Sequence, residues 1–381
     1  MKIVYCLNSI RYLGGIQKVT IVKANALAEI PGNEVYVVVT DNKVGLQVQP
    51  LSDKVKLIDL DINYYENDTE RSQLMDLYVS YFKRKKHFKK LKETLFSIHP
   101  DVVISVGTCE KFMLLSMRSR TWKVVREFHF EKNYRIKYSK GLLDRLIAVV
   151  MDFYDFNIKE KQYDRIVLLT NEDHNLNWKG WKNIKVIPNP ISFTCDEHST
   201  LNSKTIVSLG RLDPVKNYAS LIRVYHHVYE RHPDWILKIY GDGGQREPLQ
   251  RLVDSLGLQE NVSLMGYTDD VMGALKEASI FALSSICEGF ALVIAEAMEC
   301  GLPPVSYQCP CGPFDIISEG KDGFLVPVND ERAMAERICT LIENEDQRKS
   351  MGAAAKVKAR NYHVDTIIKQ WMDLFEEVVK S

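Results

Sequence analysis

Residues 279–327 have the sequence SIFALSSICEGFALVIAEAMECGLPPVSYQCPCGPFDIISEGKDGFLVP. Three apolar runs in this stretch, at 279–285, 302–307 and 323–327, predict buried strands, because their hydrophobicity is continuous rather than alternating. Between the first two runs, residues 291–300 have the spacing of a helix that Gly301 and Pro303 end. A strand, a helix and another strand in this order predict parallel strands joined by right-handed crossovers.

The same alternation continues outward over the whole chain, which at 381 residues is too long for one ordinary core. Residues 188–205, PNPISFTCDEHSTLNSKT, have two prolines and no helical period, which is typical of a linker. We therefore predict an α/β protein with two Rossmann-like domains, residues 1–189 and 190–363, facing each other across a cleft. The last helical stretch, 364–381, is expected to cap either domain, including by packing back on the first. Further predicted strands lie at 2–8, 34–40, 55–60, 101–107, 123–128, 164–170, 205–210, 235–241 and 261–266.

The composition excludes several classes of protein. Fifty basic residues balance fifty acidic ones, so the chain lacks the positive field that attracts nucleic acid. The apolar runs reach only six residues, as at 146–151, far fewer than the run of about 18 that indicates a transmembrane helix. The apolar start of the chain is too short for a secretory signal. The eight cysteines are scattered, so we expect reduced, mostly buried thiols and a cytoplasmic protein.

Two loops that follow predicted strands contain residues suited to binding phosphate, and parallel sheets bind ligands at this edge. Gly14 and Gly15 precede a predicted helix, where backbone amides can approach a phosphate; a plain tight turn is the alternative. Arg211 and Lys216 follow the strand at 205–210, where a guanidinium and an ammonium would neutralise a diphosphate. Two ordinary surface cations are the alternative there.

A third candidate site follows the predicted strand at 279–285 and contains two glutamates eight residues apart. Glu288 precedes the helix that begins near residue 291, and Glu296 lies within that helix. The free amides at the start of this helix, those of Phe290, Ala291 and Leu292, could hold a phosphate between the two carboxylates. Such an arrangement fits an extended nucleotide-sugar, with the ribose at one carboxylate and the sugar at the other. The alternative is a surface glutamate on an amphipathic helix.

The stretch 288–327 resembles the nucleotide-sugar signature of glycosyltransferase family 4, whose members are retaining enzymes of the two-domain GT-B type. The resemblance continues in order over almost the whole chain and is densest from 205 to 330. It implies transfer of a hexose-type sugar from a nucleoside diphosphate, most commonly UDP, to a hydroxyl acceptor such as a glycan or lipid-linked glycan in cell-surface polysaccharide synthesis. Further motifs that carry it are LGGIQK, LLTNEDHNLNW, IPNPI, VSLGRLDPVKN, LKIYGDGG and VSLMGYTDD.

The resemblance also assigns roles by position. It implies that Glu296 binds the ribose hydroxyls and that Glu288 contacts the donor sugar. Arg211 and Lys216 would neutralise the pyrophosphate, and the amides of Phe290, Ala291 and Leu292, with Gly14 and Gly15 from the other domain, would approach the distal phosphate. Tyr267 matches the position that contacts the base. His129, in REFHF, matches the histidine beside the reacting sugar, with Glu127 as the alternative.

The sequence departs from the family pattern at two positions. Ala291 stands where many relatives have Gly or Pro, which would narrow the space near the donor. Gln308 stands where close relatives often have Asp, so any role of that carboxylate is absent here.

The resemblance implies metal-independent chemistry without a cofactor, in which cations and a helix dipole replace a divalent ion. Cys309 and Cys311 are spaced unlike a zinc knuckle and are expected to pack beside the diphosphate site. The alternative functions are a nucleotide-sugar 2-epimerase of the same fold and a non-catalytic nucleotide-sugar-binding subunit. A dehydrogenase, suggested by GDGG at 241–244, lacks the rest of its fingerprint.

Residues 83–92, KRKKHFKKLK, form a strongly basic stretch in an otherwise neutral chain. One interpretation is the solvated face of a helix. The other is peripheral contact with an anionic membrane surface.

Overall fold

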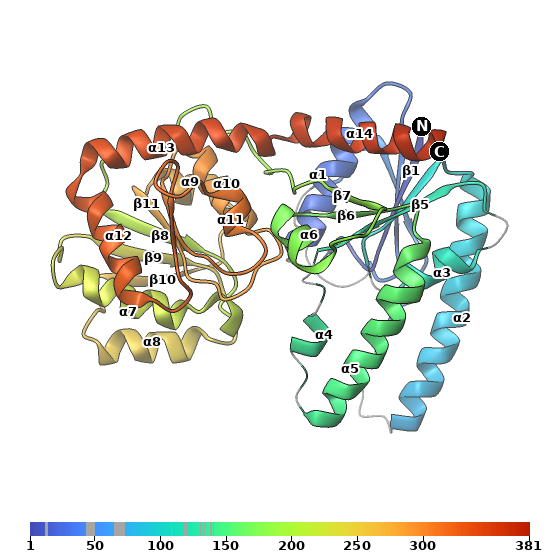
Figure 1. The fold of residues 1–381 in the computed structure, drawn as a ribbon, viewed down its shortest axis with the longest axis horizontal. Helices are drawn as coiled ribbons and strands as arrows, with labels where there is room; N and C mark the ends of the chain where they lie inside the picture. The colour runs from blue at the N-terminus through green and yellow to red at the C-terminus, as the bar shows by residue number, and fades with distance from the viewer. Residues whose placement is uncertain are drawn as a thin grey trace. The chain divides into compact units, whose positions relative to one another are not determined.

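The computed structural model describes residues 1–381 except 12–13, 43–49, 65–72, 108, 118–119, 130–131, 133, 138 and 140; for 73–78, 134 and 137 it describes the backbone alone. Within the motifs quoted above, Leu13 and Phe130 therefore lie outside the described residues. The chain forms two compact units (Figure 1). The first contains residues 1–169, 177–190 and 364–381, and the second contains 170–176 and 191–363.

The first unit contains a seven-stranded parallel sheet in the order β3-β2-β1-β4-β5-β6-β7. Its strands are β1 (Lys2–Leu7), β2 (Glu34–Val39), β3 (Val55–Asp59), β4 (Val102–Ser105), β5 (Lys123–Glu127), β6 (Arg165–Leu168) and β7 (Ile184–Val186). Its helices are α1 (Gly15–Glu29), α2 (Gln73–Ile98), α3 (Lys111–Ser116), α4 (Tyr134–Lys137), α5 (Leu142–Tyr154) and α14 (Val364–Lys380).

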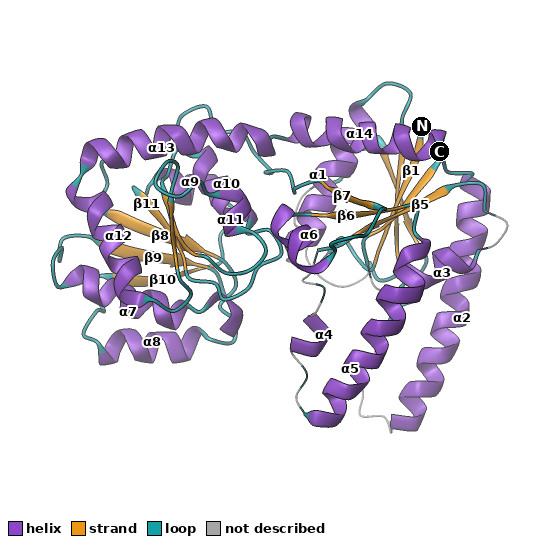
Figure 2. Cartoon of the chain, in the orientation of Figure 1, coloured by secondary structure: helices purple, strands orange, loops and turns teal. Residues whose placement is uncertain are grey.

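Both faces of this sheet are covered, which explains the continuous hydrophobicity of its strands. In β1, Ile3 and Tyr5 point into the cluster formed with α1 and α14, while Val4 and Cys6 point into the cluster formed with α2 and α3. Figure 2 shows helices on either side of the sheet. Helix α14 belongs to this layer through Trp371, which is fully buried, although it lies at the end of the chain.

The second unit contains a six-stranded parallel sheet in the order β10-β9-β8-β11-β12-β13. Its strands are β8 (Thr205–Leu209), β9 (Ile236–Tyr240), β10 (Val262–Gly266), β11 (Ile280–Leu283), β12 (Pro304–Tyr307) and β13 (Phe324–Val326). Its helices are α7 (Tyr218–Tyr229), α8 (Arg246–Ser255), α9 (Val271–Lys276), α10 (Leu292–Glu299), α11 (Pro313–Ile316), α12 (Glu331–Glu343) and α13 (Glu345–Ala359).

The helix α6 (Asn171–Asn177) joins the two units, and nearly all of it groups with the second although it precedes the expected boundary near 190. The reason is local: the backbone amides of Asn171 and Glu172 donate to the Asp315 carboxylate at 2.8 and 3.0 Å. A carboxylate at a helix N-terminus satisfies amides that have no partner within the helix.

The prediction of an α/β fold with two Rossmann-like sheets is confirmed. The predicted strands correspond to β1–β6 and β8–β13. The three-residue strand β7 was not predicted, because its sequence is short and adjoins the proline-containing linker.

In each unit the order of the strands reverses beside the first strand, between β1 and β4 and between β8 and β11. Such switch points leave a crevice at the carboxyl ends of the strands, where open α/β sheets bind their ligands. The loops after β8 and β11 are therefore neighbours at the edge of the second sheet.

Candidate functional site

The loop after β8 presents a lysine toward the loop after β11. Asp213 accepts hydrogen bonds from the amides of Val215 and Lys216 at 3.1 and 3.2 Å, and so caps the short turn Pro214–Lys216. The Nζ of Lys216 lies 2.7 Å from Oε1 of Glu288, and the two side chains are 19% and 10% exposed. The structure thus brings together two of the residues singled out in the sequence, at the switch point of the second sheet.

Glu288 is held in place from its own loop as well as by Lys216. Ser285 donates from Oγ to Oε1 of Glu288 at 2.6 Å, and Ser284 donates to the carbonyl of Lys216 at 2.9 Å. A carboxylate that accepts two hydrogen bonds on one oxygen keeps its other oxygen for a ligand. The two serines connect the loops, a role that the sequence pattern alone did not indicate.

Arg211 lies on the same loop but is mostly exposed. Its guanidinium pairs with Asp213 at 3.0 Å, and 76% of its side chain is accessible to solvent. An exposed guanidinium retains free N–H groups with which it can bind a phosphate.

Close packing of backbone fixes the base of this loop. A side chain at Gly241, after β9, would overlap the carbonyl of Gly210, and one at Gly243 would come within 2.5 Å of the carbonyl of Leu212. The amide of Leu212 in turn donates to the carbonyl of Asp242 at 2.9 Å. Gly241 and Gly243 of the GDGG motif therefore support the loop that carries Arg211 and Lys216, and their presence needs no dinucleotide.

Helix α10 begins directly after the loop of Glu288. Ala291 caps it in the left-handed conformation (φ 56°), a region that costs an alanine free energy. Phe290 and Ala291 are buried, and a side chain at Gly312 would come within 2.9 Å of the Phe290 backbone. The amides at the start of α10, including that of Leu292, have no partner within the helix, so this end of α10 is suited to an anion.

Glu296 projects from the second turn of α10 and is buried, with Ser192 donating to it at 3.3 Å. One turn further on, Glu299 accepts from the amide of Cys195 at 2.9 Å and contacts Nε2 of His363 at 2.8 Å. The two glutamates of this helix are thus both integrated in the fold, and the contacts of Glu299 are structural.

The ring of Tyr267, after β10, is half exposed. Partial burial, together with the neighbouring Asp269, raises the pKa of its phenol to about 12. The phenol therefore stays neutral at physiological pH and presents a flat, accessible face.

Cys309 and Cys311 form no disulfide and are buried in the loop before α11. Burial, with Glu288 nearby, raises the pKa of Cys309. The amide of Cys311 donates to Glu172 at 2.9 Å, a contact between loop and α6 that no sequence signal indicated. Among the described residues, the group spaced closely enough to share a metal ion is His226 and His227 of α7 with Glu230 directly after it, and it includes neither cysteine.

In the first unit, Gly14 caps α1 in an extended conformation, and Gly15 is its first residue. A Cβ at Gly15 would meet no atom within 4 Å, and one at Gly14 would meet only the flexible side chain of Gln17. The described chain therefore gives no packing or dihedral reason for glycine at either position.

His129 follows β5 and is part of a buried charged group. Its Nε2 lies 3.2 Å from Oε1 of Glu127, and the same oxygen pairs with Nζ of Lys23 on α1. All three side chains are at most 3% exposed, and Lys23 also lies 4.8 Å from the ring of Trp371. We define Lys23, Glu127 and His129 as the buried triad.

The neighbouring charges in the buried triad shift the pKa values of Glu127 and Lys23. Burial alone would raise the pKa of Glu127, but Lys23 and His129 outweigh it and lower that pKa to about 2. Burial lowers the pKa of Lys23, and Glu127 opposes this effect. Glu127 is therefore ionised and already paired with Lys23, and the same oxygen lies beside His129.

The sequence analysis missed Lys23, although a signal was present. In α1 the buried positions Val19, Thr20, Ala24 and Leu27 follow the helical period, and Lys23 occupies the same face. A lysine on a core face indicates a buried acidic partner.

Part of the chain matches a known protein family. Residues 196–358, within the second unit, match the family model "Glycosyl transferases group 1". An uncharacterised glycosyltransferase of Haemophilus influenzae is 29% identical over 374 residues, 97% of this chain and 98% of that protein. A Campylobacter jejuni N-acetylgalactosaminyltransferase, whose described substrate is a glycan on diphospho-undecaprenol, is 24% identical over 96% of both chains.

Solved structures share the fold. Staphylococcus aureus TarM, crystallised with UDP, superposes with a TM-score of 0.76 at 16% identity, over 98% of this chain and 99% of that chain. HepE of Anabaena, crystallised with UDP and glucose, has a TM-score of 0.72 at 18% identity, over 99% of both chains. The matched region, the full-length relative and the shared fold show that the chain has the GT-B fold and that its second unit is similar to the group 1 glycosyltransferases, family 4.

Proposed function

We propose that this glycosyltransferase moves a hexose-type sugar from a nucleoside diphosphate to a hydroxyl acceptor with retention at the anomeric carbon. The observation that carries the proposal is the pairing of Lys216 with Glu288, at 2.7 Å, at the switch point of the second sheet. A cation beside the start of α10 suits a diphosphate, and a carboxylate in the same place suits the hydroxyls of a sugar.

In this proposal the diphosphate lies between Arg211, Lys216 and the amides of Phe290, Ala291 and Leu292. Glu296 binds the ribose, Glu288 orients the donor sugar, and Tyr267 packs against the base. Gly14 and Gly15 leave room for the distal phosphate, and His129 lies beside the reacting sugar. Each of these roles follows from the position of the residue in the family motifs.

Chemically, the bond between the anomeric carbon and the distal phosphate oxygen breaks, and a bond from that carbon to the acceptor oxygen forms. Negative charge develops on the departing diphosphate, where Lys216, Arg211 and the start of α10 stabilise it more than in the ground state. The acceptor proton passes to the departing phosphate oxygen. No metal is needed for this charge stabilisation.

Uridine is the proposed base, which is supported by the UDP complexes of TarM and HepE, proteins of the same fold. A glycan or lipid-linked glycan is the proposed acceptor. Two Campylobacter jejuni relatives are described as acting on glycans carried by diphospho-undecaprenol, and a Staphylococcus aureus relative as acting on poly(ribitol-phosphate). This acceptor class supports a role in cell-surface polysaccharide synthesis.

A thermal-shift screen of nucleotide-sugars tests the proposal. A ligand at 100 times its dissociation constant stabilises the folded state by about 2.7 kcal/mol, which is readily measured. We expect one UDP-sugar to stabilise the protein and then to release UDP when acceptors are added. The product should keep the anomeric configuration of the donor, as measured by NMR.

The alternatives give different results in the same assay. A 2-epimerase would convert the nucleotide-sugar without an acceptor, and a non-catalytic subunit would bind it without turnover. Inversion at the anomeric carbon would contradict the retaining mechanism.

A further inference from the structure

Helix α5 exposes an unusual number of apolar side chains. It contains a run of six apolar residues, 146–151, yet within α5 only Ala148 and Asp152 are buried. On the side opposite these two, Leu142, Leu146, Val150 and Phe153 are 61–89% exposed. Other large exposed apolar residues of α5 are Leu143, Ile147, Val149, Met151 and Tyr154. Contiguous apolar surface of this kind marks a binding surface.

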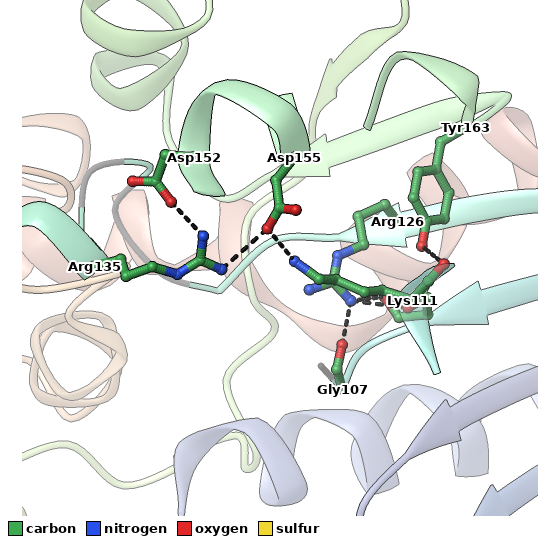
Figure 3. A network of polar contacts seen from close by, with 8 residues as sticks. Gly107, Lys111, Arg126, Arg135, Asp152, Asp155 and Tyr163 are labelled. Carbon is green, nitrogen blue, oxygen red and sulfur yellow. Dashed lines mark hydrogen bonds and ion pairs between the residues drawn. The ribbon is translucent and has the colours of Figure 1, made fainter. Parts of the chain in front are cut away.

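The C-terminal end of α5 is nevertheless held by ion pairs. Arg135 donates to Asp152 at 2.6 Å and to Asp155 at 3.0 Å, and Lys111 pairs with Asp155 at 3.0 Å (Figure 3). These ion pairs attach the C-terminal end of α5 to the rest of the first unit. The apolar side therefore belongs to an ordered helix that points away from its own core.

The topology directs the free ends of α5 and α2 beyond the carboxyl edge of the sheet. Both helices run from that edge back to the start of the next strand. The 26 residues of α2 span about 39 Å, whereas a six-residue strand spans about 20 Å. The first turns of α2 therefore extend past the edge, and His129 follows β5 at the same edge. In Figure 1 the ends of α2 and α5 project in the same direction.

The basic stretch 83–92 divides into two sets of cations. Lys83, Lys86 and Lys90 donate to carbonyls of residues 60–63, in the loop after β3, and so fix this part of α2 against the edge of the sheet. Arg84, Lys85, Lys89 and Lys92 are exposed. Just before them, the rings of Tyr81 and Phe82 are 53% and 49% exposed.

The exposed apolar side chains of α5, the exposed aromatic rings of α2 and the exposed cations that follow those rings match the layers of a lipid surface. Acyl chains accept the apolar side chains, aromatic rings favour the interface, and anionic headgroups attract the lysines and arginines. At 13 residues α5 is about 20 Å long, too short for a hydrocarbon core of about 30 Å. In the described residues no helix is long and apolar enough to span a membrane.

We propose that the exposed side of α5, with Tyr81 and Phe82 of α2, inserts into the surface of an anionic lipid bilayer. We define Leu142, Leu146, Val150 and Phe153 as the apolar stripe, and Arg84, Lys85, Lys89 and Lys92 as the cation collar. The proposal deepens the proposed function and rests on it for its biological meaning, because α5 runs from the carboxyl edge of the sheet, where His129 would meet an acceptor carried by a lipid.

Co-sedimentation of the whole protein with vesicles tests the proposal. We expect binding to vesicles of phosphatidylcholine with phosphatidylglycerol, and at least tenfold weaker binding to phosphatidylcholine alone. Replacing the apolar stripe by glutamine (L142Q, L146Q, V150Q and F153Q) should lower the partition coefficient at least tenfold. Replacing the cation collar by glutamine should lower it mainly at low salt, where the Debye length is longest.

A matched control removes four exposed apolar side chains elsewhere, L57Q, L176Q, V357Q and V379Q, and should bind vesicles like the wild type. All of these side chains are at least 41% exposed, so none of the variants should unfold at a different temperature. Hydrogen exchange of residues 142–154 should slow when anionic vesicles are added.

Three outcomes would overturn the proposal: no binding of wild type to anionic vesicles, equal binding of the apolar-stripe variant, or a wild-type dimer that this variant converts to a monomer. The last would make the stripe a contact between copies of the chain. The proposed function fails separately, because binding of UDP-sugars is measured without vesicles. Vesicle binding without donor binding would refute only the function.

Discussion

In the buried triad, the ionisation of one side chain depends on the side chains beside it. A lysine that is fully buried persists only with a partner, and Glu127 provides it while also contacting His129 at 3.2 Å. Removing one member of such a pair leaves an uncompensated charge and costs about 3–5 kcal/mol. Removing both charges together is often close to neutral.

Glu127 should therefore make stability depend on pH. Its pKa is lowered to about 2 in the folded state, against about 4.3 when unfolded, so its contribution is complete above pH 5 and is lost as pH falls through 4 toward 2. The difference is on the order of 3 kcal/mol. In urea unfolding, Glu127→Gln should be less stable than wild type at pH 6, and the two should converge near pH 2.

The matched control for this prediction is the double variant Lys23→Met with Glu127→Gln, which should recover most of the lost stability at pH 6. A constant gap between wild type and Glu127→Gln from pH 6 to pH 2 would show that Glu127 is not ionised in the folded protein.

Arg211 should affect activity without affecting stability. Its side chain is 76% exposed and its ion pair with Asp213 lies within its own loop, so Arg211→Ala should change the free energy of unfolding by no more than about 0.5 kcal/mol. If the guanidinium stabilises the departing diphosphate, kcat/KM should fall about 100-fold or more. A variant that keeps near-full activity would remove Arg211 from the diphosphate site.

At the scale of elements, the loop after β8 depends on the turn after β9. The amide of Gly210 donates to the carbonyl of Tyr240 at 3.0 Å, and no side chain fits at Gly241. Because Gly241 has a φ of 143°, an alanine there would also strain the backbone. The position of Lys216 is therefore set partly by a glycine on another loop.

Gly241→Ala should consequently lower both stability and donor affinity, with a loss of about 2 kcal/mol or more in the free energy of unfolding. Gly244→Ala is the control, because a Cβ there meets nothing within 4 Å. Thermal unfolding and donor titration of the two variants measure the difference. Equal behaviour of both would mean that the loop adapts and that the close approach is not required.

Much of this architecture could be predicted because it depends on local patterns. Continuous apolar runs located twelve of the strands, whereas the order of the strands in each sheet, and with it the switch points, is seen only in the structure. Strand β7 has only three residues and no apolar run, so it could not be found. The pairing of Lys216 with Glu288 depends on two loops 72 residues apart. Their proximity follows from strand order, but the distance does not.

The apolar run at 146–151 shows the limit of such patterns. Its composition is that of a buried segment, and no feature of the sequence shows that α5 projects from the first unit. Exposure is a property of tertiary packing, so it appears only in the structure. Similarly, three lysines of the basic stretch bond to the chain itself, which charge patterning cannot indicate.

At the scale of the whole molecule, the proposed mechanism requires no divalent ion, since Lys216, Arg211 and the start of α10 supply the positive charge. Turnover should therefore persist in EDTA, with at most a small change in kcat/KM. Release of UDP measured before and after chelation tests this. Complete inhibition that manganese reverses would contradict the charge assignment.

The central claim is that the Lys216–Glu288 pair is the donor site of a nucleotide-sugar transferase. Calorimetric titration of UDP into the whole protein tests it most directly. The account predicts saturable binding by the wild type, binding at least tenfold weaker by Lys216→Ala, and wild-type affinity in the Gly244→Ala control. Wild-type protein that shows no saturable binding, or Lys216→Ala protein that binds UDP as tightly as the wild type, would contradict it.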